Sequence, residues 1–151
     1  MQKEIRHTWL LQHPKEKVWE CLTKAELMNK WLMNNDFETV VGHKFMFRSK
    51  PVPQLDFDGN VFCEVLEIVP YKFLSYSWKG GAGDGAINVD TLVKWTLTPK
   101  GDATELLLEH TGFKEPLNSN IYAAMNKGWD DNISKKVTAL LNTNDDEPGC
   151  H

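Results

Sequence analysis

The sequence lacks any long apolar run and any surplus of positive charge. No apolar segment approaches the length of about 18 residues that a membrane-spanning helix needs, and residues 1–20 lack the apolar core of a signal peptide. Lys and Arg number 17 against 21 Asp and Glu, whereas nucleic-acid-binding proteins usually present a basic face. These absences predict a cytoplasmic protein with no membrane span and no nucleic-acid partner.

Motifs for metals and cofactors are also missing. The cysteines, Cys21, Cys63 and Cys150, are odd in number and lack C-x-x-C spacing, so they predict neither a disulfide framework nor a zinc site. The run GGAGDGAIN at residues 80–88 lacks the Lys and Ser/Thr of a phosphate-binding loop. We interpret it as a mobile hairpin loop or a flexible gate over a cavity. No metal and no cofactor is predicted.

The N-terminal part of the chain predicts one strand followed by two short helices. Residues 3–12 are rich in β-branched and aromatic residues and precede a His-Pro pair, which favours a strand. Apolar residues then recur at steps of three and four, which predicts two helices with Trp19 and Trp31 on their inner faces. Thr23 and Glu26 have the spacing of a capping box for the second helix.

The rest of the chain predicts an antiparallel meander and a long helix. Period-two patterns predict strands at residues 42–50, 60–70, 71–80, 88–99 and 103–113. From Asn118 to Asn142 an apolar residue recurs at every fourth position, which is typical of an amphipathic helix. The fold class is therefore α+β, with the long helix across the sheet. We expect one domain over residues 1–143 and a disordered acidic tail over 144–151.

Strand parity indicates which side chains face the long helix. Leu106, Leu108 and His110 share one face of their strand, and Glu105 and Glu109 mark the other face as solvated. The inward positions of the two preceding strands include the large flat side chains of Tyr76, Trp78 and Trp95. The helix that meets them carries Tyr122, Met125 and Trp129. Such a surface is either a solid aromatic core or the wall of a ligand pocket. Periodicity alone leaves both readings open.

Four segments in order carry a family resemblance. They are HPKEKVWECLTKAELMNKWL, VLEIVPYKFLSYSW, TELLLEHTGF and GWDDNISKKVTALL. From Ile5 to Leu141 the chain resembles the START-like, helix-grip domains of the SRPBCC superfamily, in particular the branch named after the activator of the heat-shock-protein ATPase. The resemblance implies a curved antiparallel sheet wrapped around the C-terminal helix, two short helices closing one end, and an elongated apolar cavity. It also implies that Trp31 lies at the mouth or wall of that cavity, while Trp19 packs the first short helix onto the core.

The leading hypothesis is the binding of an apolar or aromatic small molecule, lipid-like or polyketide-like, between the sheet and the C-terminal helix. Affinity would come from hydrophobic burial, and a few polar groups would orient the ligand. No catalytic residue and no metal ligand is assigned. The candidate cavity residues are Trp31, Phe45, Phe47, Tyr76, Trp78, Trp95, His110, Tyr122, Met125 and Trp129.

Two alternatives belong to other functional classes. The first is an enzyme of the cyclase or hydrolase kind, in which a cavity His or Tyr acts as acid or base. Glu109 and His110 do not form a catalytic pair, because neighbours on a strand point to opposite faces. The second is a protein-interaction or stress-related, co-chaperone-like module whose partner is unknown. We do not infer chaperone activation, because 151 residues leave no room for the separate chaperone-binding domain of the eukaryotic co-chaperone.

Overall fold

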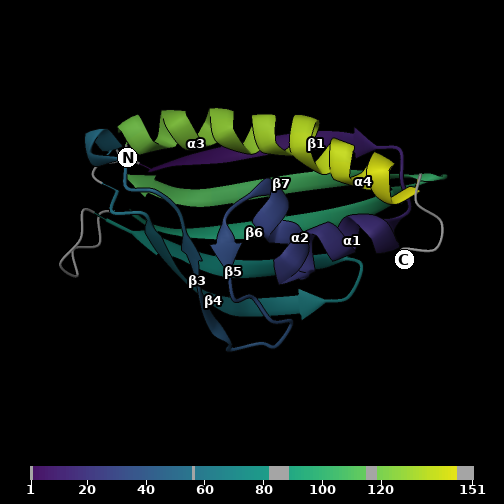
Figure 1. The fold of residues 1–151 in the computed structure, drawn as a ribbon, viewed down its shortest axis with the longest axis horizontal. Coiled ribbons are helices and arrows are strands. Elements are labelled where there is room, and N and C mark those ends of the chain that lie inside the picture. The colour runs from purple at the N-terminus through teal and green to yellow at the C-terminus, as the bar shows by residue number, and fades with distance from the viewer. Residues whose placement is uncertain (1, 56, 82–88, 115–118, 146–151) are drawn as a thin grey trace.

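A curved antiparallel sheet lies against one long helix in the computed structural model, which describes residues 2–55, 57–81, 89–114 and 119–145 (Figure 1). The strands are β1 (Gln2–Leu11), β2 (Asn34–Asn35), β3 (Lys44–Arg48), β4 (Asn60–Val69), β5 (Phe73–Gly80), β6 (Val89–Lys100) and β7 (Ala103–Lys114). The helices are α1 (Lys15–Thr23), α2 (Ala25–Trp31), the short 3-10 helix η1 (Pro53–Leu55), α3 (Ser119–Asp131), the π-helical turn η2 (Asn132–Val137) and α4 (Thr138–Asp145).

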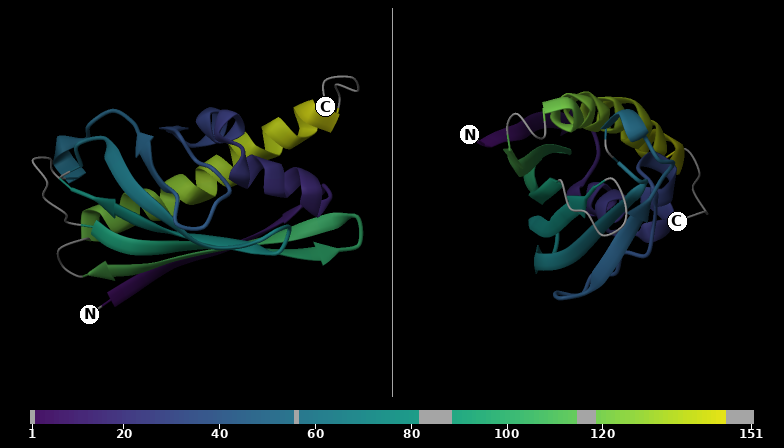
Figure 2. Two further views of the ribbon diagram at one scale, coloured as in Figure 1. Left: turned by 90° about the horizontal axis from the view of Figure 1, so that it is seen from below. Right: turned by 90° about the vertical axis from the view of Figure 1, so that its left-hand side faces the viewer.

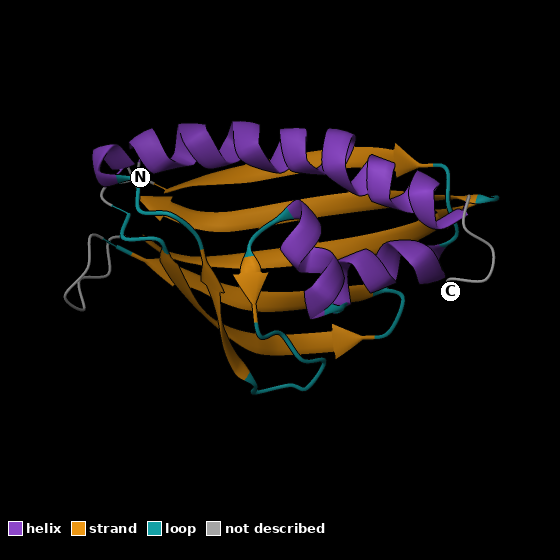
Figure 3. Cartoon of the chain, viewed as in Figure 1, coloured by secondary structure: helices purple, strands orange, loops and turns teal. Residues whose placement is uncertain are grey.

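All seven strands form one sheet in the order β1-β7-β6-β5-β4-β3-β2, and each neighbouring pair is antiparallel. The helices gather on one face of it (Figure 3). Viewed end-on, the sheet curves around the long helix, while α1 and α2 cover the same face (Figure 2). The predicted α+β, helix-grip architecture is confirmed.

Side-chain alternation in the central strands also agrees with the prediction. In β6 the buried residues are Val89, Thr91, Val93, Trp95 and Leu97, at every second position. In β7 the buried side chains include Leu106, Leu108 and His110, while Glu105 and Glu109 are only partly covered. The inner face of the sheet is therefore as rich in aromatic residues as the sequence indicated.

A β-bulge at Gly112 interrupts this alternation near the end of β7. The register between β1 and β7 shifts between Lys3 and Glu4, because Lys3 pairs with Phe113 and Glu4 with Thr111. Gly112 has a φ of +105°, and a Cβ on it would lie 3.2 Å from the carbonyl oxygen of Asp90. Only glycine fits both conditions without strain. The bulge turns Phe113 inward, so that its ring lies 4.6 Å from that of His110.

The π-helical turn explains how the long helix keeps its apolar stripe on the sheet. Residues four apart advance by about 40° per step around an α-helix, so a strict four-residue repeat drifts away from one face. The wider turn at η2 takes back part of this drift. Ile133, Val137 and Leu141 are fully buried as a result.

Several local predictions need correction. Thr23 does not cap α2: it is the last residue of α1, where its hydroxyl donates to the carbonyl of Trp19 at 2.8 Å, and Lys24 is the N-cap without a side-chain bond. Strand β2 and helix η1 were not predicted. Helix α4 continues to Asp145, two residues into the predicted tail, and residues 146–151 lie outside the described part of the chain. Residues 82–88 of the glycine-rich run also lie outside it.

Candidate functional site

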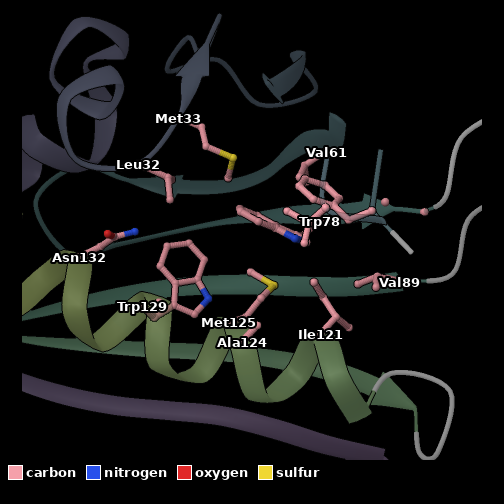
Figure 4. A pocket seen from close by; sticks show the side chains of 15 residues that line it. Leu32, Met33, Val61, Trp78, Val89, Ile121, Ala124, Met125, Trp129 and Asn132 are labelled. Atoms are coloured by element: carbon pink, nitrogen blue, oxygen red, sulfur yellow. The ribbon is translucent and has the colours of Figure 1, made fainter. Parts of the chain in front are cut away.

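A cavity of about 220 Å³ lies between the N-terminal half of the long helix and the sheet (Figure 4). The long helix contributes one wall through Ile121, Ala124, Met125, Gly128, Trp129 and Asn132. The sheet contributes the opposite wall through Val61, Trp78, Gly80 and Val89, and Gly81, directly after β5, adjoins them. Leu32 and Met33, which follow α2, complete the lining together with Val52 and Phe57, which lie between β3 and β4.

The lining is almost entirely apolar. Two polar side-chain groups face the cavity, the indole N–H of Trp78 and the carboxamide of Asn132. Among the described lining residues, none carries a side chain that titrates between pH 2 and 12. The cavity can therefore hold apolar matter and offer few hydrogen bonds, and the described wall supplies no acid or base.

Gly128 leaves open space in the helical wall. A Cβ placed on this residue would meet no atom within 4 Å, even though the residue lies inside α3. Glycine in a helix interior is less favourable than alanine by roughly 0.5–1 kcal/mol. Nothing in the packing requires a glycine there, and its effect is to enlarge the cavity.

A chain of buried hydrogen bonds fixes the two tryptophans of the cavity wall. The indole N–H of Trp129 donates to Nδ1 of His110 at 3.0 Å, so this nitrogen is an acceptor. Neutral His110 then carries its proton on Nε2, which lies 2.7 Å from the hydroxyl of Thr91. That hydroxyl donates to the carbonyl oxygen of Trp78 at 2.8 Å. Helix and sheet are thereby tied together directly behind the cavity.

Burial decides the charge state of His110. The side chain is fully buried, and desolvation lowers its pKa from 6.5 to about 3. The imidazole is therefore neutral in the folded protein at physiological pH. Both ring nitrogens are already engaged, so His110 acts as a structural link between Trp129 and Thr91 in this arrangement.

A second aromatic cluster consists of Phe37, which precedes β3, Phe45 and Phe47 of β3, and Tyr76 of β5. Neighbouring rings lie 5.0 to 6.3 Å apart, mostly edge to face. The hydroxyl of Tyr76 accepts the indole N–H of Trp95 at 3.0 Å, and burial raises the pKa of Tyr76 well above its usual range. All four residues are buried, and Phe47 packs on Trp78 of the cavity wall with ring centroids 5.2 Å apart.

The structure brings three of the ten predicted site residues to the cavity, namely Trp78, Met125 and Trp129. Trp31 and Trp95 pack edge to face with each other behind Trp129, and the indole N–H of Trp31 donates to the carbonyl of Cys21. The hydroxyl of Tyr122 donates to the carbonyl of Glu4. The remaining predicted residues, Phe45, Phe47, Tyr76 and His110, lie in the cluster and hydrogen-bond chain above.

Sequence reasoning missed most of the actual lining. Leu32 and Met33 follow Trp31 directly, so the prediction was one residue away from them. Gly128 carried a usable signal, because a glycine inside a helical pattern is unfavourable and often has a packing or functional reason, whereas Asn132 carried none. Val52 and Phe57 lie between two strands and belong to no periodic pattern, so no signal pointed to them.

Two classes of feature are absent from the described residues. No helix among them is long and apolar enough to cross a membrane. No group of three or more His, Cys, Asp or Glu side chains in that part of the chain is placed to hold a metal ion.

Solved structures of similar proteins cover nearly the whole chain. Protein MLL2253 from Mesorhizobium loti is 35% identical with a TM-score of 0.81, over 93% of this chain and 98% of that one. The Aha1 dimer from Colwellia psychrerythraea is 21% identical with a TM-score of 0.73, over 92% and 96% of the two chains. PFC0360w, an HSP90 activator from Plasmodium falciparum, is 18% identical with a TM-score of 0.72, over 92% and 96%. The last two show a shared fold.

Sequence comparison gives the family. No curated protein matches the chain. The family model described as "Activator of Hsp90 ATPase homolog 1-like protein" matches residues 12–142. Since this match covers most of the chain, from α1 through strands β2 to β7 to most of the long helix, the chain belongs to this family of AHSA-type START-like domains.

Proposed function

We propose that the protein binds a small apolar or aromatic molecule in the cavity between α3 and the sheet. The observation that carries this proposal is an apolar space of about 220 Å³ that the chain's own side chains leave open. Family membership supports a ligand-binding domain in general and leaves the ligand unspecified. The helical glycine at Gly128 adds support, because it enlarges the cavity at a cost in helix stability.

The volume limits the size of the ligand. An engineered apolar cavity of about 150 Å³ accommodates benzene, so about 220 Å³ corresponds to roughly nine or ten non-hydrogen atoms. A fused bicyclic ring system has this size. A longer lipid-like or polyketide-like molecule would place one end in the cavity and the rest outside it.

The expected affinity is moderate. Burying about 200 Å² of aromatic surface stabilises a complex by roughly 5 kcal/mol, which corresponds to a dissociation constant of about 0.2 mM. The sulfur atoms of Met33 and Met125 both lie at the cavity in Figure 4. Methionine adapts its shape and interacts favourably with aromatic rings, by about 0.3–1.5 kcal/mol. An aromatic ligand therefore fits this lining better than an aliphatic one of equal size.

The enzymatic alternative lacks a specific supporting observation. It requires an acid or base in contact with the ligand. His110 and Tyr76 are each held by a tryptophan N–H and lie outside the described lining.

Naphthalene is the appropriate probe, because it has the expected size and no polar atom. We expect partial occupancy that rises with naphthalene concentration up to its solubility limit in tryptophan fluorescence, with a dissociation constant of about 0.2 mM. The variant Gly128→Leu places a side chain in the cavity and should abolish this binding. Ala123→Leu is the matched control, since Ala123 is exposed on the same helix and outside the lining.

Circular dichroism and thermal unfolding should show both variants folded. Equal naphthalene binding by the wild type and Gly128→Leu would place the binding elsewhere and overturn the proposal. Absence of binding to the wild type up to the solubility limit of naphthalene would do the same.

A further inference from the structure

The cavity contains a hydrogen-bond donor that the protein leaves unused. Trp78 is only 4% exposed, and its indole lines the cavity. Its N–H donates to no acceptor among the described residues. The N–H is not among the fully enclosed polar atoms without a partner, so it remains accessible to a molecule that enters the cavity. Most polar groups in protein interiors are hydrogen-bonded, and a ligand acceptor would give this one a partner.

Three other tryptophans of the core differ from Trp78, because each of their indole N–H groups has an acceptor. Trp31, Trp95 and Trp129 are each at most 2% exposed, and their N–H groups donate to the carbonyl of Cys21, the hydroxyl of Tyr76 and the imidazole of His110. All three bonds are between 2.8 and 3.0 Å long.

Trp19 also has no described acceptor for its N–H. It packs against Tyr71, which is exposed, and it does not line the cavity. Trp78 is therefore the tryptophan whose free donor faces a space of ligand size, within the part of the chain that the structure describes.

Trp78 is also held in place. Its carbonyl oxygen accepts a hydrogen bond from the Thr91 hydroxyl, which is itself hydrogen-bonded to His110. Its ring lies 5.4 Å from that of Trp129 at an interplanar angle of 60°. A donor fixed by its surroundings loses little conformational entropy when it forms a hydrogen bond. The N–H is thus positioned before any ligand arrives.

The cavity wall offers no compensation for charge. No described lining residue is charged, and moving an ionised group into an apolar site without a partner is strongly unfavourable. Asn132, at the end of the cavity near Leu32 and Trp129, adds one neutral amide (Figure 4). Its amide likewise has no hydrogen-bond partner among the described residues.

From these observations we propose that the cavity selects a neutral, flat aromatic molecule that carries a hydrogen-bond acceptor, and that the indole N–H of Trp78 binds this acceptor. This inference rests on the proposed function and specifies its ligand class. The aromatic part fills the space beside Met125 and Trp129. The acceptor, such as a ring nitrogen or a carbonyl oxygen, lies against Trp78.

The test compares three probes on the full chain. Naphthalene has no polar atom, quinoline has the same shape with one acceptor nitrogen, and 2-naphthoate adds a negative charge. Replacement of Trp78 by benzothienylalanine, a tryptophan analogue with sulfur in place of N–H, keeps the shape of the side chain. Trp78→Phe is the simpler variant, and Trp95→Phe is the control, because the N–H of Trp95 is bonded to Tyr76 outside the described lining.

We expect the benzothienylalanine replacement, which removes the Trp78 N–H and keeps the shape of the side chain, to weaken quinoline binding by about five- to tenfold, the usual contribution of one hydrogen bond. It should change naphthalene binding less than twofold, whereas Trp78→Phe also enlarges the cavity and serves to assign the NMR signal. In two-dimensional 1H–15N NMR spectra, the indole signal that is absent from Trp78→Phe should shift downfield with quinoline and not with naphthalene. 2-Naphthoate should bind at least tenfold more weakly than naphthalene.

The possible failures are distinct. If none of the probes binds the wild type, the proposed function fails. If naphthalene and quinoline both bind and lose the same affinity when the Trp78 N–H is removed, the cavity is a binding site but Trp78 does not select an acceptor. Binding of 2-naphthoate as tight as that of naphthalene would overturn the selection for neutral ligands.

Discussion

The two ends of the long helix face the same sheet, yet one end is packed solid and the other is hollow. Around α4 and η2, the side chains of Ile133, Val137 and Leu141 are fully buried, and η2 contacts α2. Around α3, Ile121 and Met125 are only partly buried and face the cavity.

The difference arises from what covers each end. The two short helices reach only part of the sheet, near α4, as Figures 1 and 3 show. The other end is covered by residues between strands, such as Val52 and Phe57, together with Leu32 and Met33. These segments leave a space of about 220 Å³ unfilled beside α3. The fold thus combines a packed core and an apolar cavity along one helix.

Replacing one isoleucine at each end of the long helix by alanine should give the largest difference between the two ends. Ile133→Ala should lower the free energy of unfolding by about 2–5 kcal/mol, because it opens a void in a packed core. Ile121→Ala should lower the free energy of unfolding by about 1 kcal/mol or less, because this side chain already borders the cavity. Urea denaturation measures both. Equal losses would mean that the two ends are equally well packed.

The hydrogen-bonded histidine between the two ends should make stability depend on pH. Burial lowers the pKa of folded His110 to about 3, below the ordinary value of 6.5 for the unfolded chain. The unfolded state therefore takes up the proton first as pH falls. The contribution of neutral His110 to the free energy of unfolding is complete above about pH 6.5. Up to about 3 kcal/mol of this contribution is lost between pH 6.5 and pH 4.

Two measurements check the titration of His110. In NMR spectra, the imidazole signals of His110 should keep one chemical shift from pH 7 to pH 4. The variant His110→Leu should show a shallower fall of the free energy of unfolding over the same pH range, although it is less stable throughout. A midpoint near pH 6.5 for His110 in the folded protein would contradict the expectation.

The sequence allowed the sheet and the long helix to be predicted, because their patterns are local and regular. Strand β6 places Thr91, Val93 and Trp95 inward by simple alternation, and this alternation is a direct consequence of backbone geometry. The bulge at Gly112 is different, because it depends on the pairing of β7 with β1 and on the close approach of Asp90. Alternation alone therefore does not place Phe113 in the core.

The cavity was harder to predict because it is defined by missing atoms. Large aromatic residues such as Trp31 and Trp95 indicated a pocket wall, yet they fill space and make a solid core. The hollow end depends instead on the small residue Gly128 and on non-periodic residues such as Phe57. No pattern in the sequence measures the volume that remains between distant segments.

The smallest expected effect concerns one methyl group at the hollow end. Gly128→Ala should stabilise the protein by about 0.5–1 kcal/mol, since alanine is the better helix former and its Cβ meets no atom within 4 Å. The same methyl group reduces the cavity, so naphthalene affinity should fall by about threefold or more.

Ala123→Gly is the control for Gly128→Ala, because it makes the opposite change, removal of a methyl group, on the exposed side of the same helix. It should lower stability by a similar amount and leave naphthalene binding unchanged. Thermal unfolding and calorimetry on the two variants separate the effect on the helix from the effect on the cavity. A stabilised Gly128→Ala with weakened binding would mean that the protein gives up helix stability to keep binding space. If Gly128→Ala were less stable than the wild type, the space beside Gly128 would have to be filled in solution.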